Sequence, residues 1–309
     1  FLIVFSTFEF DTGSASAFHG AVKNEVQGTG HPIVDLSERY GSQGKLQGYI
    51  DMAALSRRVT EPTQTGFNQS LMVLGHELLH QWSAKASFDQ GNGLDRGLIG
   101  KDDGHWSNLL DSGASVLYGH KWRDNENGSF TSTAYQKFYS PLDLYLAGFN
   151  RASEVPPLLL IDNLSIDKNL TPEESIAQIG RTINGVKRTV TIEQIIAAEG
   201  ERNPSFENSQ KDFRFAFVLL TEPFKPVLEE HIAGLNNFSK GFIDRFSIWT
   251  GGRATANIYP ESVVTPTGDP GEVVVGDVRA DPAVLNDGFI WLREQQNTSW
   301  FWRDKSSST

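Results

Sequence analysis

One apolar run carries the main structural signal of this chain: Asn68-Gln-Ser-Leu-Met-Val-Leu-Gly-His-Glu-Leu-Leu-His-Gln-Trp82. Its apolar residues recur with helical spacing, so we expect a largely buried helix over about 68–83. His76 and His80 are four residues apart and therefore share one face of that helix. Both imidazoles can then reach one metal ion, with Glu77 turned toward water held on that ion.

The order His76, Glu77, His80 is typical of catalytic zinc sites. Two histidine nitrogens bind the metal, water occupies an open position, and the adjacent carboxylate acts as a base. The alternative is an amphipathic helix that carries two histidines and binds no metal. The apolar context favours the metal site, because an active-site helix must also pack in the core.

Size and composition narrow the class of protein. A chain of 309 residues exceeds one average domain, and a hydrophobic content of 39% allows a sizeable core. The net charge of −11 argues against a nucleic-acid partner. No apolar run approaches about 18 residues, so we expect no membrane span. The chain has no cysteine, so a metal site must use His, Asp or Glu.

The N-terminal residues bear on localisation. Phe1 opens a predicted strand directly, without a charged leader before it. We therefore expect the chain to be part of a longer precursor whose signal peptide is not in this sequence. That interpretation implies an extracellular or periplasmic location.

The remaining patterns predict an α+β domain over residues 1–260. Strands are expected over 1–10, 45–52 and 212–220, and the second alternates weakly, as an edge strand does. Helices are expected over 140–148 and 191–199, as one or two helices over 226–250, and from a capped start at Thr171. Residues 84–140 are rich in Gly, Asp, Asn and Ser, which indicates long loops with short elements between them.

These elements suggest how the domain is divided. We expect a twisted sheet and the active-site helix within about 1–84, a loop-rich and largely helical part within 85–260, and a cleft between them. The strand over 45–52 would be available at the cleft to pair with an extended peptide. The composition of residues 261–283 predicts a linker, with one strand over 272–275.

A third zinc ligand must come from outside the helix, and the block Asp102-Asp-Gly-His-Trp-Ser-Asn-Leu-Leu-Asp-Ser-Gly-Ala-Ser-Val-Leu-Tyr-Gly-His120 contains candidates. This block resembles the leishmanolysin-type branch of the metzincin peptidases, which have a downstream His-Trp pair and then a turn carrying methionine. The resemblance implies that His105 is the third ligand and that Ser115–Tyr118 is the turn. The same order of motifs is similar to that of bacterial secreted metallopeptidases, over residues 1 to about 258.

Two residues depart from the metzincin pattern. Ser83 stands where those enzymes have a glycine after the helix, and Leu117 stands at the methionine position. In a site like that of thermolysin-like enzymes, with a carboxylate ligand from a second helix, Asp143 is the alternative third ligand. The other candidates for that position are Asp103, Asp111 and His120.

Several further residues have a chemical and a structural interpretation. Tyr118 and Tyr145 are candidates to donate a hydrogen bond to the oxyanion, with core packing as the alternative for both. Asp124–Gly128 predicts a turn between two strands, because Tyr135 occupies the position where a calcium loop needs glutamate. Three other histidines lack metal-ligand spacing and are interpreted as ordinary surface or core residues: His19, His31 and His231.

The C-terminal residues carry a separate, weaker signal. Residues 284–309 predict a C-terminal helix or the start of a helical repeat domain. Within them, the stretch from Gly288 to Trp300 resembles one repeat of the squalene-cyclase-like α/α-toroids, with Thr298 in place of the turn glycine.

Together these features predict a zinc-dependent endopeptidase that acts on a peptide or protein substrate. His76, His80 and His105 hold Zn²⁺, and Glu77 takes a proton from zinc-bound water and passes it to the leaving amine. The alternatives are a zinc-containing binding module without proteolytic activity and another zinc hydrolase, such as a deacetylase.

Overall fold

The computed structural model describes residues 1–13, 15–135, 138–163, 165–169, 179–222 and 224–259, and the backbone of two short strands, β16 (Val274–Val275) and β17 (Val278–Arg279). The chain divides into two compact units, Phe1–Tyr259 and Pro260–Thr309. In the second unit, β16 lies within the strand predicted over 272–275 and pairs antiparallel with β17. The helix start predicted at Thr171, the rest of the linker and the C-terminal helix lie outside the described residues.

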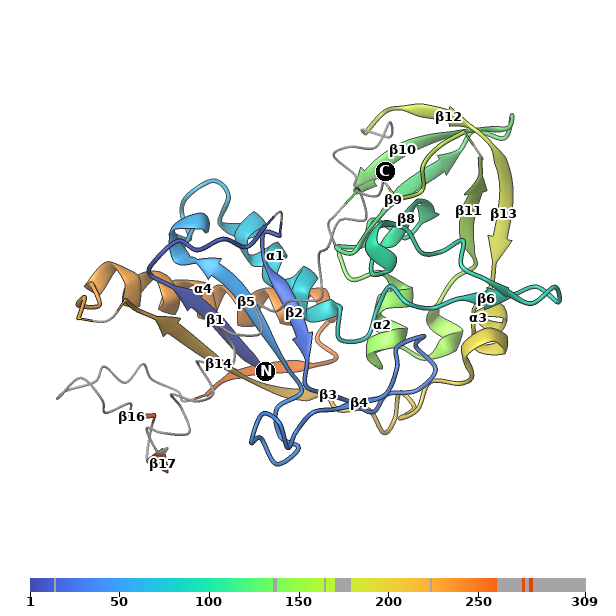
Figure 1. The fold of residues 1–309 in the computed structure, drawn as a ribbon. Helices are drawn as coiled ribbons and strands as arrows, with labels where there is room; N and C mark the ends of the chain where they lie inside the picture. Colours follow the sequence, from blue (N-terminus) through green and yellow to red (C-terminus); the bar gives the residue numbers. More distant parts are fainter. Residues whose placement is uncertain are drawn as a thin grey trace, which may run out of the picture. The chain divides into compact units, whose positions relative to one another are not determined.

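A five-stranded sheet forms one part of the first unit (Figure 1). Its strand order is β15-β14-β1-β5-β2, and all neighbours run parallel except β2, which is antiparallel to β5. The bounds are β1 (Leu2–Ser6), β2 (Phe18–Ala21), β5 (Gly48–Ala54), β14 (Asp212–Leu220) and β15 (Thr255–Ile258). The strands predicted over 1–10 and 212–220 therefore form at the centre of this sheet.

The edge strand beside β5 is β2, so the prediction of an edge strand over 45–52 is wrong. β5 has hydrogen-bonded neighbours on both sides, and only Tyr49 among its residues is not buried. Its weak alternation arises because both faces of the strand are covered. β2 escaped prediction because Gly20 interrupts it, and that glycine lies directly under the ring of Tyr49.

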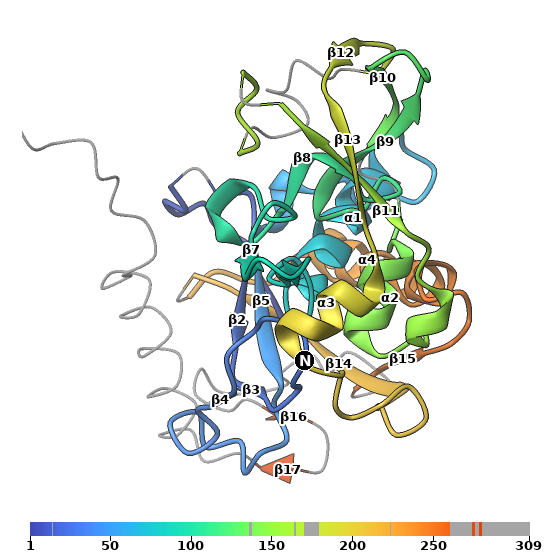
Figure 2. The same ribbon diagram turned by 90° about the vertical axis from the view of Figure 1, so that its right-hand side faces the viewer.

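Two helices, α1 (Phe67–Leu79) and α4 (Glu229–Trp249), pack on one face of this sheet (Figures 1 and 2). Phenylalanines of α4 recur every four residues, so one stripe of the helix meets the sheet. Phe238 contacts Phe5 of β1 with ring centroids 5.2 Å apart, and Phe242 contacts Phe215 of β14 at 5.0 Å. The pattern over 226–250 thus forms a single helix.

Gly75, next to His76 on α1, allows α4 to approach closely. A Cβ at this position would lie 2.6 Å from the ring of Trp249, and the Gly75 carbonyl accepts a hydrogen bond from the Tyr139 hydroxyl at 2.8 Å. Alanine is ordinarily the better helix former, but here it would overpack a buried contact.

We expect Gly75→Ala to lower the free energy of unfolding by about 1–3 kcal/mol, because the Trp249 ring must move. Urea unfolding of the variant measures this change. Gln69→Ala, at an exposed position of the same helix, is the control and should change stability by no more than about 0.5 kcal/mol. A Gly75→Ala protein more stable than the wild type would show that helix propensity outweighs the contact.

A six-stranded sheet forms the other part of the first unit, in the order β12-β10-β9-β8-β11-β13. Its pairs are antiparallel apart from β8 and β9. The bounds are β8 (Trp106–Asp111), β9 (Tyr118–Asp124), β10 (Ser129–Tyr135), β11 (Leu158–Asp162), β12 (Thr182–Asn184) and β13 (Val186–Val190). The prediction that residues 85–260 are largely helical is therefore wrong, because strands dominate there.

The predicted local features of this region are present. The turn over Asp124–Gly128 joins β9 to β10 and is closed by a hydrogen bond from the Asn125 N–H to the Ser129 carbonyl. The helices predicted over 140–148 and 191–199 are α2 (Pro141–Ala147) and α3 (Ile192–Glu199).

Short elements complete the first unit. The remaining strands are β3 (Lys23–Asn24), β4 (Val34–Asp35), β6 (Phe88–Asp89) and β7 (Leu94–Asp95), and the 3-10 turns are η1 (Leu55–Arg57), η2 (Lys101–Asp103) and η3 (Ala152–Glu154). The described residues thus have a mixed α+β fold with four α-helices, as predicted at this coarse level. No helix among them has the length and apolarity needed to cross a bilayer.

The two sheets lie on either side of the C-terminal end of α1 (Figures 1 and 2). That end of the helix carries His76, Glu77 and His80. The fold therefore places the candidate site between a mainly parallel sheet and a mainly antiparallel one.

Candidate metal centre

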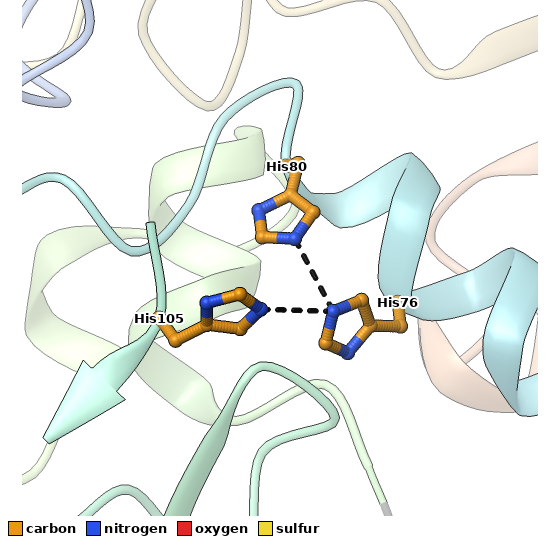
Figure 3. Close-up of side chains that lie close together, drawn as sticks. All are labelled: His76, His80 and His105. Carbon is orange, nitrogen blue, oxygen red and sulfur yellow. Dashed lines mark hydrogen bonds between the residues drawn. The ribbon is translucent and has the colours of Figure 1, made fainter. Parts of the chain in front are cut away.

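Three histidine side chains meet at the end of α1. His76 and His80 lie on the same helix face, with their Nε2 atoms 3.2 Å apart. His105 comes from the segment just before β8, and its Nε2 atom is 3.1 Å from that of His76. Figure 3 shows the three rings converging on one point. Among the described residues this is the group whose nitrogen atoms lie close enough together to hold one metal ion.

The spacing of the three nitrogens suits zinc. Tetrahedral zinc binds imidazole nitrogen at about 2.0–2.1 Å, which puts neighbouring ligand nitrogens about 3.3 Å apart. The measured separations of 3.1 and 3.2 Å are close to that value. Three protein ligands leave the fourth position for water, as in catalytic zinc sites.

The outer ring nitrogens show which tautomers are present. Nδ1 of His76 lies 2.7 Å from the Val116 carbonyl, and Nδ1 of His105 lies 3.1 Å from the Lys101 carbonyl. A carbonyl can only accept a hydrogen bond, so each Nδ1 carries the proton and donates. Both Nε2 atoms then present lone pairs to one another across the site.

Facing lone pairs need a cation between them. Burial lowers the pKa of His76 to about 4 and that of His105 to about 3, so a shared proton is disfavoured at neutral pH. The same burial lowers the pKa of His80 well below its ordinary value. The contact between His76 and His105, one of the two dashed lines in Figure 3, is therefore repulsive unless a metal ion lies between the rings. The donor set fits Zn²⁺, which binds neutral imidazole.

A strained turn presents His105. Asp102 and Asp103 both have left-handed backbone angles, with φ of 57° and 52°. The turn is closed by a hydrogen bond from the Gly100 N–H to the His105 carbonyl at 2.8 Å. The sequence Asp-Asp-Gly thus reverses the chain and brings His105 back under the end of α1.

The segment Ser115–Tyr118 lies against two of the histidines, His76 and His105. Its Val116 carbonyl holds His76, and Leu117 is fully buried. The ring of Tyr118 stacks on that of His105, with centroids 4.2 Å apart and an interplanar angle of 16°. Tyr118 is therefore part of the site.

Tyr145 has a different role. Its ring is buried and its hydroxyl accepts a hydrogen bond from the backbone N–H of Arg202 at 3.3 Å. Of the two tyrosines considered for the oxyanion, Tyr145 is thus a core residue.

The chain turns away from the helix one residue later than the metzincin pattern implies. α1 ends at Leu79 with His80 as its cap, and the left-handed residue is Ala84, with φ of 63°. Ser83 instead donates a hydrogen bond through Oγ to Asp143 at 2.6 Å. The serine at position 83 is therefore compatible with the turn, because another residue takes the left-handed angle.

Asp143 is not a member of the histidine cluster. Its Oδ1 atom accepts hydrogen bonds from Ser83 Oγ at 2.6 Å and Trp106 Nε1 at 2.8 Å. Its Oδ2 atom accepts one from the backbone N–H of Ser140 at 2.8 Å. Both carboxylate oxygens are thus engaged elsewhere, and the structure does not bring Asp143 into the position of a ligand.

The other candidates for the third ligand also point elsewhere. Asp103 pairs with Arg96 at 3.2 Å, Asp111 accepts a hydrogen bond from the Gly113 N–H, and His120 contacts the Asn108 carbonyl through Nδ1. None of these three residues belongs to the cluster of metal-ligand atoms found among the described residues.

Glu77 is buried beside the edge strand. Only 7% of its surface is exposed, and burial raises its pKa to about 8. The positive charge of Arg58 and a hydrogen bond from the backbone N–H of His19, on β2, lower the pKa of Glu77 and so oppose the effect of burial. A dication on the neighbouring imidazoles would favour the carboxylate further.

Some parts of the site could not be predicted from the sequence. The carbonyls of Val116 and Lys101 orient two histidines, but a backbone carbonyl leaves no mark on residue identity. Arg58 had no recognisable spacing relative to Glu77. Comparisons with protein-family models, with curated proteins and with solved structures found no match, so the chemistry of the site carries the functional assignment.

Proposed function

We propose that this chain is a zinc-dependent endopeptidase. The observation that carries the proposal is the convergence of three neutral imidazoles, from His76, His80 and His105, next to the buried Glu77. Structural zinc sites have four protein ligands, whereas catalytic sites keep a position for water. Three nitrogen ligands beside a carboxylate base therefore favour hydrolysis over a purely structural metal.

The histidines and Glu77 would have separate roles in the reaction. His76, His80 and His105 would hold zinc through Nε2, with His76 and His105 kept in the correct tautomer by the Val116 and Lys101 carbonyls. Zinc, when bound, polarises the substrate carbonyl and lowers the pKa of its water. Glu77 takes the proton of the attacking water and returns it to the leaving amine. Its burial suits this role, because a general base works best with a pKa near the working pH.

The substrate would be an extended peptide or protein segment. β2 is one of the two edge strands of the five-stranded sheet, and its His19 N–H is next to Glu77, so a peptide that pairs with β2 would pass the site. Tyr118 is the remaining candidate to donate a hydrogen bond to the oxyanion, since its ring lies on His105.

The arrangement supports placing the chain near the metzincin peptidases of leishmanolysin type. The helix is followed by His105 and then by a buried turn, Ser115–Tyr118, that contacts His76. An extracellular or periplasmic location belongs to the same proposal, because the resemblance is to secreted enzymes.

Metal analysis and a peptide-library digest test the proposal. We expect about one zinc per chain and cleavage at internal peptide bonds that a chelator abolishes and added zinc restores. A zinc-loaded protein that cleaves no peptide would instead support the binding module. Release of acetate from acetylated sugars, without peptide cleavage, would support the deacetylase.

A further inference from the structure

Asp143 is a buried carboxylate outside the metal cluster. Its residue is fully buried, and no Lys, Arg or His in the described ranges forms an ion pair with it. Three donors contact its oxygens: Ser83 Oγ, Trp106 Nε1 and the Ser140 N–H. Burying a carboxylate without an ion-pair partner is costly even when it is hydrogen-bonded. The burial of Asp143 therefore requires a physical explanation.

A helix cap alone does not account for these contacts. Ser140 and Asp143 form a capping box at the start of α2, and that box uses only Oδ2. Oδ1 reaches instead to Ser83 and Trp106, which are 60 and 37 residues away in the chain. The carboxylate therefore links distant segments in addition to capping its own helix.

The two distant segments each carry a metal ligand. Ser83 is three residues after His80, and Trp106 directly follows His105. By accepting hydrogen bonds from both segments through one atom, Asp143 sets the distance between the end of α1 and the start of β8.

The network continues to the remaining ligand. The backbone N–H of Trp106 donates to the Leu117 carbonyl at 2.8 Å, and the adjacent Val116 carbonyl holds the ring of His76. The segments that carry His80 and His105, and the segment that holds the ring of His76, are thus connected to one carboxylate through Ser83 and Trp106.

We propose that Asp143 is a positioning residue of the metal centre. Its carboxylate holds His80 and His105 at the separation that a single ion requires. The inference rests on the proposed function only in requiring that zinc binds at the three histidines. It assigns no contact between Asp143 and the metal or substrate.

Asp143→Asn tests this role with almost no change in size. The amide oxygen can still accept from Ser83 and Trp106, but the amide nitrogen then faces the Ser140 N–H, donor against donor. The variant also loses the negative charge. We expect the zinc dissociation constant to rise about 10–100-fold, the range typical for residues that support a metal ligand.

Two further variants distinguish an effect on the positions of the zinc ligands from an effect on the stability of the fold. Ser140→Ala removes the reciprocal capping bond from the Asp143 N–H to Ser140 Oγ but leaves the carboxylate and its acceptor contacts in place. It should lower thermal stability while changing zinc affinity by less than about threefold, because its effect is that of a lost cap. Trp106→Phe keeps an aromatic ring and removes one donor to Oδ1, so it should weaken zinc binding. Its effect should be less than additive with that of Asp143→Asn.

The measurements are zinc affinity by competition with a chromophoric chelator, thermal unfolding of the metal-free proteins, and the visible absorption of the cobalt-substituted forms. A changed cobalt spectrum in Asp143→Asn, with weaker zinc binding, is the expected result. Zinc affinity equal to that of the wild type in Asp143→Asn and in Trp106→Phe overturns the role of Asp143, and so does equal weakening by Ser140→Ala. A wild-type protein that binds no zinc overturns the proposed function instead.

Discussion

Glu77→Gln is expected to reduce peptide hydrolysis by at least about 10²-fold while the protein keeps its zinc. Glutamine has nearly the same shape and can occupy the same buried position next to Arg58 and the His19 N–H. It cannot accept a proton from water at neutral pH. Turnover of a peptide found in the library digest measures the first part, and metal analysis of the same preparation measures the second.

A matched control distinguishes the loss of the catalytic base from a general effect of removing one negative charge. Glu61→Gln makes the same chemical change at an exposed position before α1 and should retain full turnover. If Glu77→Gln hydrolysed peptide at the wild-type rate in a chelator-sensitive assay, Glu77 would not be the base. A Glu77→Gln protein without zinc would show that the residue supports the metal and would leave the base unassigned.

The features predicted correctly from sequence are mainly local. The helical spacing of His76 and His80 places both on one face without any knowledge of the fold. α2 begins after Ser140 and ends before Gly148, and the capping box and left-handed glycine at these positions are set by neighbours within four residues. Local signals of this kind depend on few residues, so contacts with distant parts of the chain seldom change the structure that they predict.

Of the second sheet, the sequence predicted only the pair of strands around the turn over Asp124–Gly128, because the strands carry polar residues on their buried side. In β9, His120 and Trp122 are buried while Lys121 and Arg123 are exposed, which is the alternation of a strand. In β10 the buried position Ser132 follows the buried Phe130, so hydrophobicity alone does not reveal the period. The surrounding Gly, Asp and Asn then favoured loops.

The supports of the metal centre depend on contacts between distant segments. Asp143 has the local signature of a capping residue, and its bonds to Ser83 and Trp106 become visible only once α1, β8 and α2 are packed together. The choice between His105 and Asp143 as ligand was open for the same reason. A single sequence lists the possible ligands, but the fold decides which of them meet.

His105→Ala is expected to remove nearly all zinc from the protein. With two histidines left, the ion keeps only the ligands of α1 and loses the one that comes from beside β8. Sites with fewer than three protein ligands are not typical of stable zinc centres. Zinc per chain, measured after dialysis against metal-free buffer, should fall from about one to near zero, and peptide hydrolysis should fall with it.

His231→Ala provides the control, because it removes an imidazole on α4 that is not part of the cluster. It should keep its zinc and its activity. Circular dichroism of His105→Ala should show wild-type secondary structure, since the ring of His105 lies at the site and is not part of the buried apolar core. A metal-loaded His105→Ala together with a metal-free Asp143→Ala would contradict the three-histidine site. That outcome would place a carboxylate in the third position and move the chain toward the carboxylate-liganded zinc peptidases.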